Sequence, residues 1–206
     1  MNTKKKISGL ITATLLLSST FAFTTPANAA GKGWRYWAYY QAAPNAKTWT
    51  AAMTGPTVDV QDGAVEGWSF VFDASDVPTI APSIKPDFAS ICRRVKADKN
   101  LKRIALVVDF GRSAYAPKGE KVQKSFTKCV QIAKSAQGID VLGQAVKIRA
   151  ANSGLICGIN GYPAKECGVE IPTPYALKKS PFINEIVASA NLVDLVALDS
   201  WRGNQR

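Results

Sequence analysis

The sequence predicts an α+β fold: a mixed or antiparallel β-sheet with a few packing helices and two disulfides. Residues 34–41 are dense in Trp and Tyr, which suit a pleated, half-buried strand. Residues 103–110 form a nearly unbroken apolar run, as expected of a strand covered on both faces. After Pro86, apolar residues recur at helical spacing. These observations together favour a sheet packed against a small number of helices.

The first 29 residues are predicted to be a cleavable secretory signal. Lys4, Lys5 and Lys6 form a basic n-region, residues 7–23 are uncharged and apolar, and Ala27-Asn28-Ala29 places small residues before the cleavage point. A membrane anchor is the alternative, but the apolar stretch is at or below the roughly 20 residues that span a bilayer. We therefore expect a secreted mature chain, residues 30–206, with no transmembrane segment.

The mature chain is predicted to be a single α+β domain in four consecutive parts. Residues 34–73 should form an aromatic β-meander, residues 74–135 an insertion, residues 136–170 a helix and a strand ending in an Ile-Asn turn, and residues 171–206 a C-terminal segment. Turn residues bound the strands of the meander, which are expected at 34–41, 48–53 and 65–72.

The later parts are predicted to contribute three helices and two strands. Helices are expected from Pro86-Asp87 to Lys99-Asn100, at 122–136 and at 140–146, and strands at 103–110 and 154–159. The strand at 103–110 should be central in the sheet. The apolar stretch 182–198 carries too many polar residues to span a membrane, so we expect it to dock as a helix, or as a helix plus a strand.

The four cysteines, Cys92, Cys129, Cys157 and Cys167, all lie in the mature part. In an oxidising compartment an even number implies two disulfides, with three possible pairings. We favour Cys157 with Cys167, across a short loop containing Gly and Pro, and Cys92 with Cys129. A structural zinc site is the alternative, but the chain has no histidine and no Cys-x-x-Cys spacing, so no metal ligand is assigned.

The mature chain is basic. Removing the three signal lysines leaves 26 − 3 = 23 Lys and Arg against 15 Asp and Glu, a net charge near +8. The anions outside a cell are wall polymers, lipid head groups and acidic ligands, so attachment to the envelope is expected and nucleic acid binding is not. The alternative is a solvated basic surface, because the basic residues are scattered along the chain.

The residue types disfavour catalysis. Without histidine, a Ser-His-Asp triad and a Cys-His pair are excluded, and the cysteines are expected to be oxidised. A carboxylate hydrolase stays open, with Asp109 and one of Asp62, Glu66 or Asp73 as acid and base. Asp109 also has a structural alternative, in which it accepts hydrogen bonds from backbone donors in the Gly111 turn. We therefore assign no catalytic residue.

Two passages resemble the domain found at the C-terminus of cobalamin carriers such as transcobalamin and intrinsic factor. The aromatic half is carried by Tyr36-Trp37-Ala38-Tyr39-Tyr40, Trp49, Thr54-Gly55-Pro56 and residues 62–70. Residues 139–146 and 154–161 are similar to the other half, a short helix before a strand that ends in an Ile-Asn turn. Here this half follows the aromatic half, whereas in the family it comes first. Either the module is circularly permuted or the second match is a chance one.

The whole chain also resembles uncharacterised secreted actinobacterial proteins whose genes often neighbour components of energy-coupling-factor transporters. Both resemblances imply a ligand-binding role, with a corrinoid as the ligand to test first. Trp37, Tyr39 and Trp49 would then hold it by stacking, and Asn160 and Tyr162 by hydrogen bonds from the turn. Core packing is the alternative role for the aromatic residues, because one side of the strand must face the core.

Three functions follow from the sequence. The first is a secreted accessory or ligand-binding domain for uptake of a corrinoid, another vitamin or a metal, with a membrane transporter as partner. The second is an interaction module at the cell envelope that binds a wall polymer or a protein through basic residues and exposed aromatic residues. The third is a carboxylate-dependent hydrolase.

Overall fold

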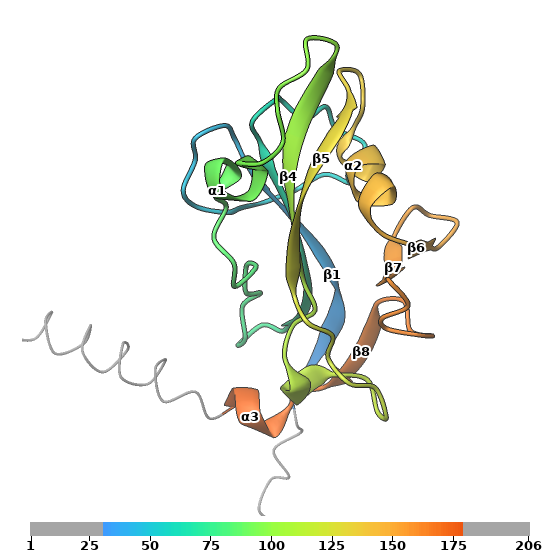
Figure 1. Cartoon of the computed structure of the whole chain (residues 1–206). Coiled ribbons are helices and arrows are strands. Elements are labelled where there is room, and N and C mark those ends of the chain that lie inside the picture. Colours follow the sequence, from blue (N-terminus) through green and yellow to red (C-terminus); the bar gives the residue numbers. More distant parts are fainter. Residues whose placement is uncertain (1–30, 179–206) are drawn as a thin grey trace, which may run out of the picture.

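The computed structural model describes residues 31–178 and confirms the α+β class (Figure 1). The predicted signal, 1–29, and the predicted docking segment, 182–198, lie outside the described residues. The main sheet follows the order β2-β1-β3-β4-β5, with β8 also paired to β1, while β6 and β7 form a separate pair. The strands are β1 (Lys32–Ala42), β2 (Thr50–Ala51), β3 (Val65–Asp73), β4 (Leu101–Asp109), β5 (Phe126–Ala133), β6 (Ile148–Ala150), β7 (Ile156–Ile159) and β8 (Val169–Pro172). The helices are α1 (Phe88–Cys92), α2 (Gly138–Ala145) and α3 (Tyr175–Lys178), and Ser113–Tyr115 is a 3₁₀ turn.

β4 is the buried strand that the apolar run predicted. It pairs parallel with β3, from Val65 opposite Ala105 to Ser69 opposite Asp109, and antiparallel with β5 on its other side. All residues from Ile104 to Val108 have 0% of their surface exposed. A strand with a neighbour on each edge and a layer on each face has no polar side, which is why its sequence does not alternate.

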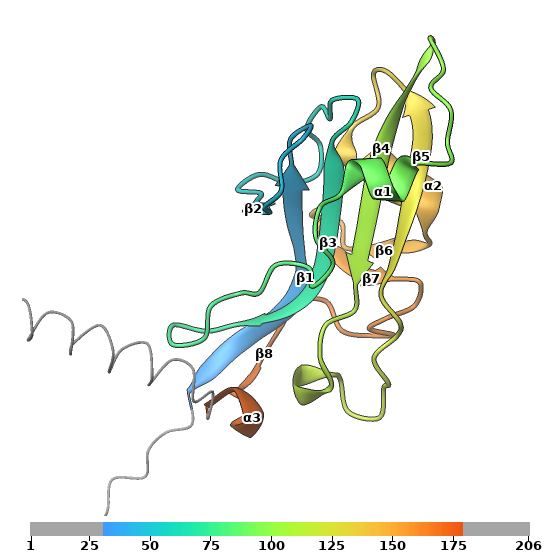
Figure 2. The same ribbon diagram turned by 60° about the vertical axis from the view of Figure 1, so that its left-hand side comes forward.

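Both faces of the sheet are covered. The aromatic face carries Trp37, Tyr39, Trp68, Phe70 and Leu106, and its covering residues are Val141, Leu142, Ile156, Ile159 and Tyr162 of α2, β7 and the turn after β7. The opposite face, the α1 face, carries Ala42, Val65, Ala105 and Val107, and its covering residues are Trp49, Ile84, Phe88, Ile91 and Cys92. Figure 2 shows α1 and α2 on opposite sides of β4 and β5.

The aromatic block 34–73 is not a meander. β2 pairs with one edge of β1 through Tyr40 and Gln41, and β3 pairs along the other edge from Trp34 to Ala42. β2 and β3 are therefore not neighbours, as they would be in a meander. β1 is long enough to take a strand on each edge, and the connection 52–64 is long enough to cross its end. The predicted strand at 48–53 is reduced to the two residues of β2.

The prediction of a helix at 122–136 is wrong, because this segment contains β5. Phe126, Val130 and Ala133 have helical spacing, but Lys128, Val130 and Ile132 also alternate with Thr127, Cys129 and Gln131 as in a strand. Pairing with the exposed edge of β4 decides between the two periodicities, because β4 would otherwise leave a row of buried backbone groups unpaired.

Helix α1 begins where predicted but is much shorter. The Asp87 carboxylate accepts a hydrogen bond from the Ser90 N–H at 3.1 Å and caps its first turn. The helix ends at Cys92 rather than near Lys99. A turn follows, in which the Val95 N–H donates to the Cys92 carbonyl and the Val95 carbonyl accepts from Arg103. This turn returns the chain to β4 sooner than a helix of twelve or more residues would allow.

The helix predicted at 140–146 and the strand predicted at 154–159 correspond to α2 and β7, and the turn Asn160-Gly161-Tyr162-Pro163 follows β7. β8 was not predicted. It pairs antiparallel with the first residues of β1, from Lys32 opposite Pro172 to Arg35 opposite Val169. The two ends of the described chain therefore lie side by side (Figure 1).

Candidate functional site

The two disulfides join Cys92 to Cys129 and Cys157 to Cys167, with Cα–Cα distances of 4.9 and 4.2 Å. These are the pairings favoured from the sequence. The first fixes α1 to β5 across the α1 face. The second closes the loop after β7, which passes over the end of the aromatic face.

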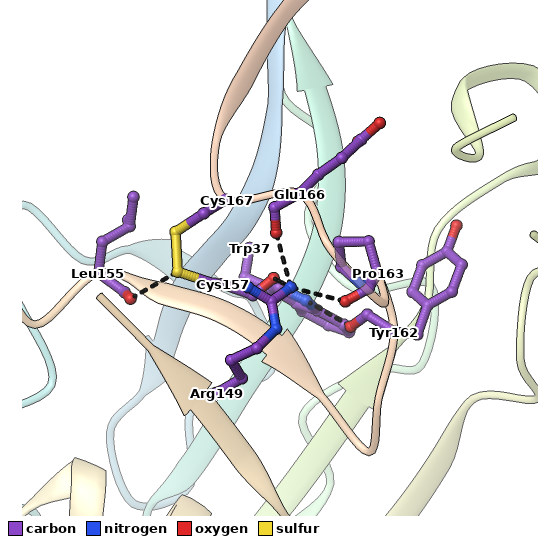
Figure 3. Close-up of a disulfide and its surroundings, with 8 residues drawn as sticks. All are labelled: Trp37, Arg149, Leu155, Cys157, Tyr162, Pro163, Glu166 and Cys167. Atoms are coloured by element: carbon purple, nitrogen blue, oxygen red, sulfur yellow. Dashed lines mark hydrogen bonds between the residues drawn. A yellow bond between two sulfur atoms is a disulfide. The ribbon is translucent and has the colours of Figure 1, made fainter.

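Three of the five predicted ligand-binding residues lie in the hydrophobic core. Trp37 packs against Phe70 and Phe110 with ring centroids 5.6 and 5.4 Å away, and its Nε1 donates to the Tyr162 carbonyl at 3.1 Å (Figure 3). Tyr39 stacks on Trp68 at 4.9 Å, and Tyr162 is buried against Phe70 and Phe110. In this structure these rings form the contact between the sheet and its cover.

The other two predicted residues lie elsewhere. Trp49 is on the α1 face, where its Nε1 donates to the Ile84 carbonyl at 3.0 Å and its ring lies over Gly67. A Cβ at Gly67 would come within 2.7 Å of the Trp49 ring, so this contact requires glycine. Asn160 is exposed in the turn, and its side chain accepts from the Lys147 N–H at 3.0 Å. The structure thus brings together Trp37 and Tyr162 but not the set of five, and corrinoid binding by that set stays a prediction.

Arg149 organises the second disulfide loop, which the sequence did not indicate. One of its terminal nitrogens donates to the carbonyl oxygens of Cys157, Pro163 and Glu166 at 3.2, 2.8 and 2.7 Å (Figure 3). The Glu166 carboxylate pairs in turn with the Arg35 guanidinium of β1. These two arginines are structural, because each satisfies groups of the fold and neither offers its charge to an open surface.

Glu66 lies at the edge of a cavity of about 310 Å³ where β1 ends and β3 begins. Its carboxylate accepts hydrogen bonds from the Tyr39 hydroxyl and from Gln41 Nε2, the latter at 3.2 Å. Burial raises the pKa of Glu66, although the two hydrogen bonds and the charge of Lys102 oppose the shift. Burial and the nearby Glu66 also raise the pKa of Tyr39 far above its ordinary value. Glu66, Tyr39 and Gln41 therefore form a buried polar network, and the carboxyl group at its centre has a raised pKa.

Asp109 takes the structural role that was its alternative. Its carboxylate accepts from the Ser83 N–H and hydroxyl at 2.7 and 2.5 Å, and from Gly111 and Ser125 at 3.0 Å each. Burial would raise the pKa of Asp109, but these hydrogen bonds outweigh burial and hold the pKa below its ordinary value. Glu66 and Asp109 belong to opposite faces of the sheet, since Ser69, three positions after Glu66, is the strand partner of Asp109. They do not form an acid–base pair.

The structure separates the basic residues into two groups. Lys102 is buried, and its Nζ donates to the Val60 and Ala136 carbonyls at 2.7 and 2.6 Å. Arg103 lies over the Phe88 ring, 5.4 Å from its centroid, and donates to the Val95 carbonyl at 3.0 Å. With Arg35 and Arg149, these cations are committed to the fold. The sequence could not separate Lys102 and Arg103 from the exposed cations, because they occur in the same basic stretch as Arg93 and Arg94.

A second group of cations lines a groove of about 490 Å³ between α1 and β5. We call it the basic groove; its lining residues are Ile84, Lys85, Asp87, Ser90, Ile91, Arg93, Arg94 and Thr127. Lys85, Arg93 and Arg94 are exposed, and Asp87 already accepts the capping hydrogen bond of α1. Within the described residues the ion pairs are Lys32 with Glu170 and Arg35 with Glu166, and no groove cation takes part in them. Among the described residues, the groove therefore presents three cations without an ion-pair partner and one carboxylate, that of Asp87.

Among residues 31–178, no group of His, Cys, Asp and Glu is arranged to hold a metal ion. No helix in that part of the chain is long and apolar enough to cross a membrane.

The fold is that of a small α+β domain with a mixed sheet and two disulfides. The basic groove lies on one face of the sheet, and the buried polar network around Glu66 lies on the other. The family model of the SCO2322-like domain matches residues 29–172, and the chain belongs to this family. Neither a search of curated proteins nor a search of solved structures found a match.

Proposed function

We propose that this chain is an exported binding domain that docks an acidic protein partner at the cell envelope through the basic groove. The observation that supports the proposal is that Lys85, Arg93 and Arg94 form no ion pair among the described residues and lie beside the apolar side chains of Ile84 and Ile91. Cations next to apolar surface suit a peptide segment that carries both acidic and apolar side chains. The two disulfides fit export, because disulfides persist in oxidising compartments.

A protein partner is favoured over a wall polymer by the position of the exposed aromatic residues. Sugar rings are commonly held by stacking on exposed aromatic faces. In the described part of the chain, the exposed aromatic residues are Trp34 in β1 and Tyr175 in α3. Both lie at the end where β1 begins and β8 ends, and neither lines the basic groove. A transporter component at the membrane, the partner implied by the family resemblance, could offer an acidic segment.

Direct corrinoid uptake receives less support from the geometry. Trp37, Tyr39 and Tyr162 would have to leave the core to stack on a macrocycle, and Trp49 faces the other side of the sheet. Calorimetry with cobalamin and cobinamide tests this function directly, and micromolar binding to the mature chain would restore it.

The test of the proposed function compares two charge-reversal variants. Arg93→Glu with Arg94→Glu reverses the groove, and Lys118→Glu with Lys121→Glu makes the same charge change in the exposed loop after β4. The probes are a fluorescent Glu-rich peptide and a glycerol-phosphate polymer. We expect the groove variant to lose at least about tenfold in peptide affinity, equivalent to about 1.4 kcal/mol, and the loop variant to stay near wild type. Added salt should weaken the wild-type interaction. Equal losses in the two variants, or binding of the polymer alone, would overturn the proposal.

A further inference from the structure

Strand β5 is the last strand of the sheet path, so one of its edges faces away from β4 (Figure 2). The direction of its backbone groups follows from the pairing on the far side of β4. The Ala105 N–H donates to Ala64 and the Arg103 carbonyl accepts from Gly63, so both of these β4 residues point toward β3. Their partners on β5, Cys129 and Gln131, are therefore in the wide, non-hydrogen-bonded positions of the ladder.

It follows that Thr127, Cys129 and Gln131 direct their N–H and C=O groups outward from the sheet. An independent contact agrees, because Gln144 of α2 donates from Nε2 to the Gln131 carbonyl at 3.0 Å. Helix α2 thus covers the Gln131 end of the edge. Within residues 31–178, no side chain hydrogen-bonds the backbone of Thr127 or Cys129. Thr127 also lines the basic groove, so the open half of the edge and the groove are one continuous surface.

An open strand edge is a template for pairing with another chain, and proteins commonly protect such edges with charge. Here the protecting charges are positive, because Lys128 lies within the open stretch and Arg93 and Arg94 lie beside it. Two copies of this chain pairing edge to edge would bring these cations together, which disfavours self-association. An acidic strand would meet no such repulsion.

We propose that the acidic partner segment binds as an added β-strand along Thr127–Cys129 of β5, with its acidic side chains at alternate positions over the basic groove. This proposal rests on the proposed function and gives its geometry. Backbone hydrogen bonds to β5 hold the segment. Because side chains alternate between the two sides of a strand, only every second residue of the segment faces Lys85, Arg93 and Arg94. A shift of one residue would turn every acidic side chain away from the groove, so the charge pattern also fixes the register.

Peptide N-methylation tests the added strand without altering the protein. The parent probe is a nine-residue peptide with Glu at alternate positions and Thr or Val between them. One derivative carries N-methyl groups on the Glu residues and the other carries them on the intervening residues. In an added strand, one set of N–H groups points at β5 and the other at solvent. We expect one derivative to lose at least about tenfold in affinity by fluorescence anisotropy and the other to bind like the parent. The amide NMR signals of Thr127 and Cys129 should shift on binding.

Three other outcomes test this proposal together with the proposed function. Equal binding of both derivatives, with sensitivity to Arg93→Glu and Arg94→Glu, overturns the added strand and keeps electrostatic docking. Failure of the parent peptide to bind below about a millimolar dissociation constant overturns both. Loss of affinity in both derivatives, with no shift at Thr127 or Cys129, also overturns the added strand, because it shows a general cost of N-methylation.

Discussion

Glu66 has 1% of its surface exposed, on a strand where most neighbours are apolar. Its pKa is raised by burial, so the folded protein holds the proton more tightly than the unfolded chain does. The contribution of this group to stability is therefore most favourable at low pH and falls as the pH rises from the ordinary glutamate value through the raised one. At neutral pH, the ionised carboxylate is a cost that a neutral amide would not carry.

We accordingly expect Glu66→Gln to be more stable than wild type at pH 8 and to lose that advantage near pH 4. Urea denaturation at several pH values measures the difference. Glu170→Gln is the control, because Glu170 is exposed and pairs with exposed Lys32, so it should change little at any pH. A Glu66→Gln protein that is less stable than wild type at pH 8 would show that the carboxylate is a net stabilising group.

The tryptophans of the first two long strands differ sharply in environment. Trp68 is 2% exposed and stacks on Tyr39, whereas Trp34 is 53% exposed near the start of β1. We expect Trp68→Ala to cost about 3–5 kcal/mol through the cavity it leaves, and Trp34→Ala to cost within about 0.5 kcal/mol, as surface substitutions usually do. Thermal melts of both variants check this, and similar melting temperatures would contradict the packing.

The sequence could place the aromatic residues on a strand but not decide what covers them. Strand alternation predicts Trp37 and Tyr39 on one side of β1, and both lie on the aromatic face. The side chains that cover them belong to α2, β7 and Tyr162. Tyr162 lies more than a hundred residues later in the chain. No local pattern reports such a contact. The same limit applies to Lys102 and Lys85, which look alike in the sequence and differ only in what the fold brings around them.

Among the secondary-structure elements, β5 was the hardest to predict. Its residues satisfy a helical and a strand period at once, and the choice is made by the edge of β4 and by the bond from Cys129 to Cys92. β4 was easier, because a short continuous apolar run is typical of a strand buried on both faces, and β3 was predicted from the Asp62-Gly63 turn that precedes it. β8 was missed because four residues carry too little pattern, and its partner lies at the other end of the chain.

The two disulfides should differ in what they support. The Cys92–Cys129 bond spans 37 residues and the Cys157–Cys167 bond spans 10, so in the chain-entropy model their loss costs about 4 and about 3 kcal/mol. Only the first fixes α1, which carries one wall of the basic groove. We expect Cys92→Ala with Cys129→Ala to weaken peptide binding, and Cys157→Ala with Cys167→Ala to leave it unchanged. Anisotropy titrations at a temperature well below the melting temperatures of both variants measure this. Equal peptide affinities of the two variants would show that α1 is not part of the binding surface.

At the scale of the whole molecule, the groove and the ends of the described chain, residues 31–178, lie at different edges of the sheet. Thr127 is level with Val107, Gly67 and Tyr40 in successive pairings, and so with the second half of β1. β8 pairs only with the first four residues of β1, on the opposite edge from β5. The α+β class and the disulfide pairing could be predicted from the sequence, but this separation depends on strand order and could not.

The pairing of β8 with β1 also fixes how the domain bears mechanical load. The Thr173 N–H donates to the Gly31 carbonyl, so the chain leaves the β1–β8 ribbon with its two ends adjacent. Tension between these ends separates the antiparallel pairs one after another, from Lys32–Pro172 to Arg35–Val169, instead of loading them together. With optical-tweezer handles at residues 31 and 178, we expect a small low-force step as β8 separates, stopped near Cys167 by its disulfide. Bound acidic peptide should survive that step, because a pull on the ends opens β8 before it reaches the edge of β5.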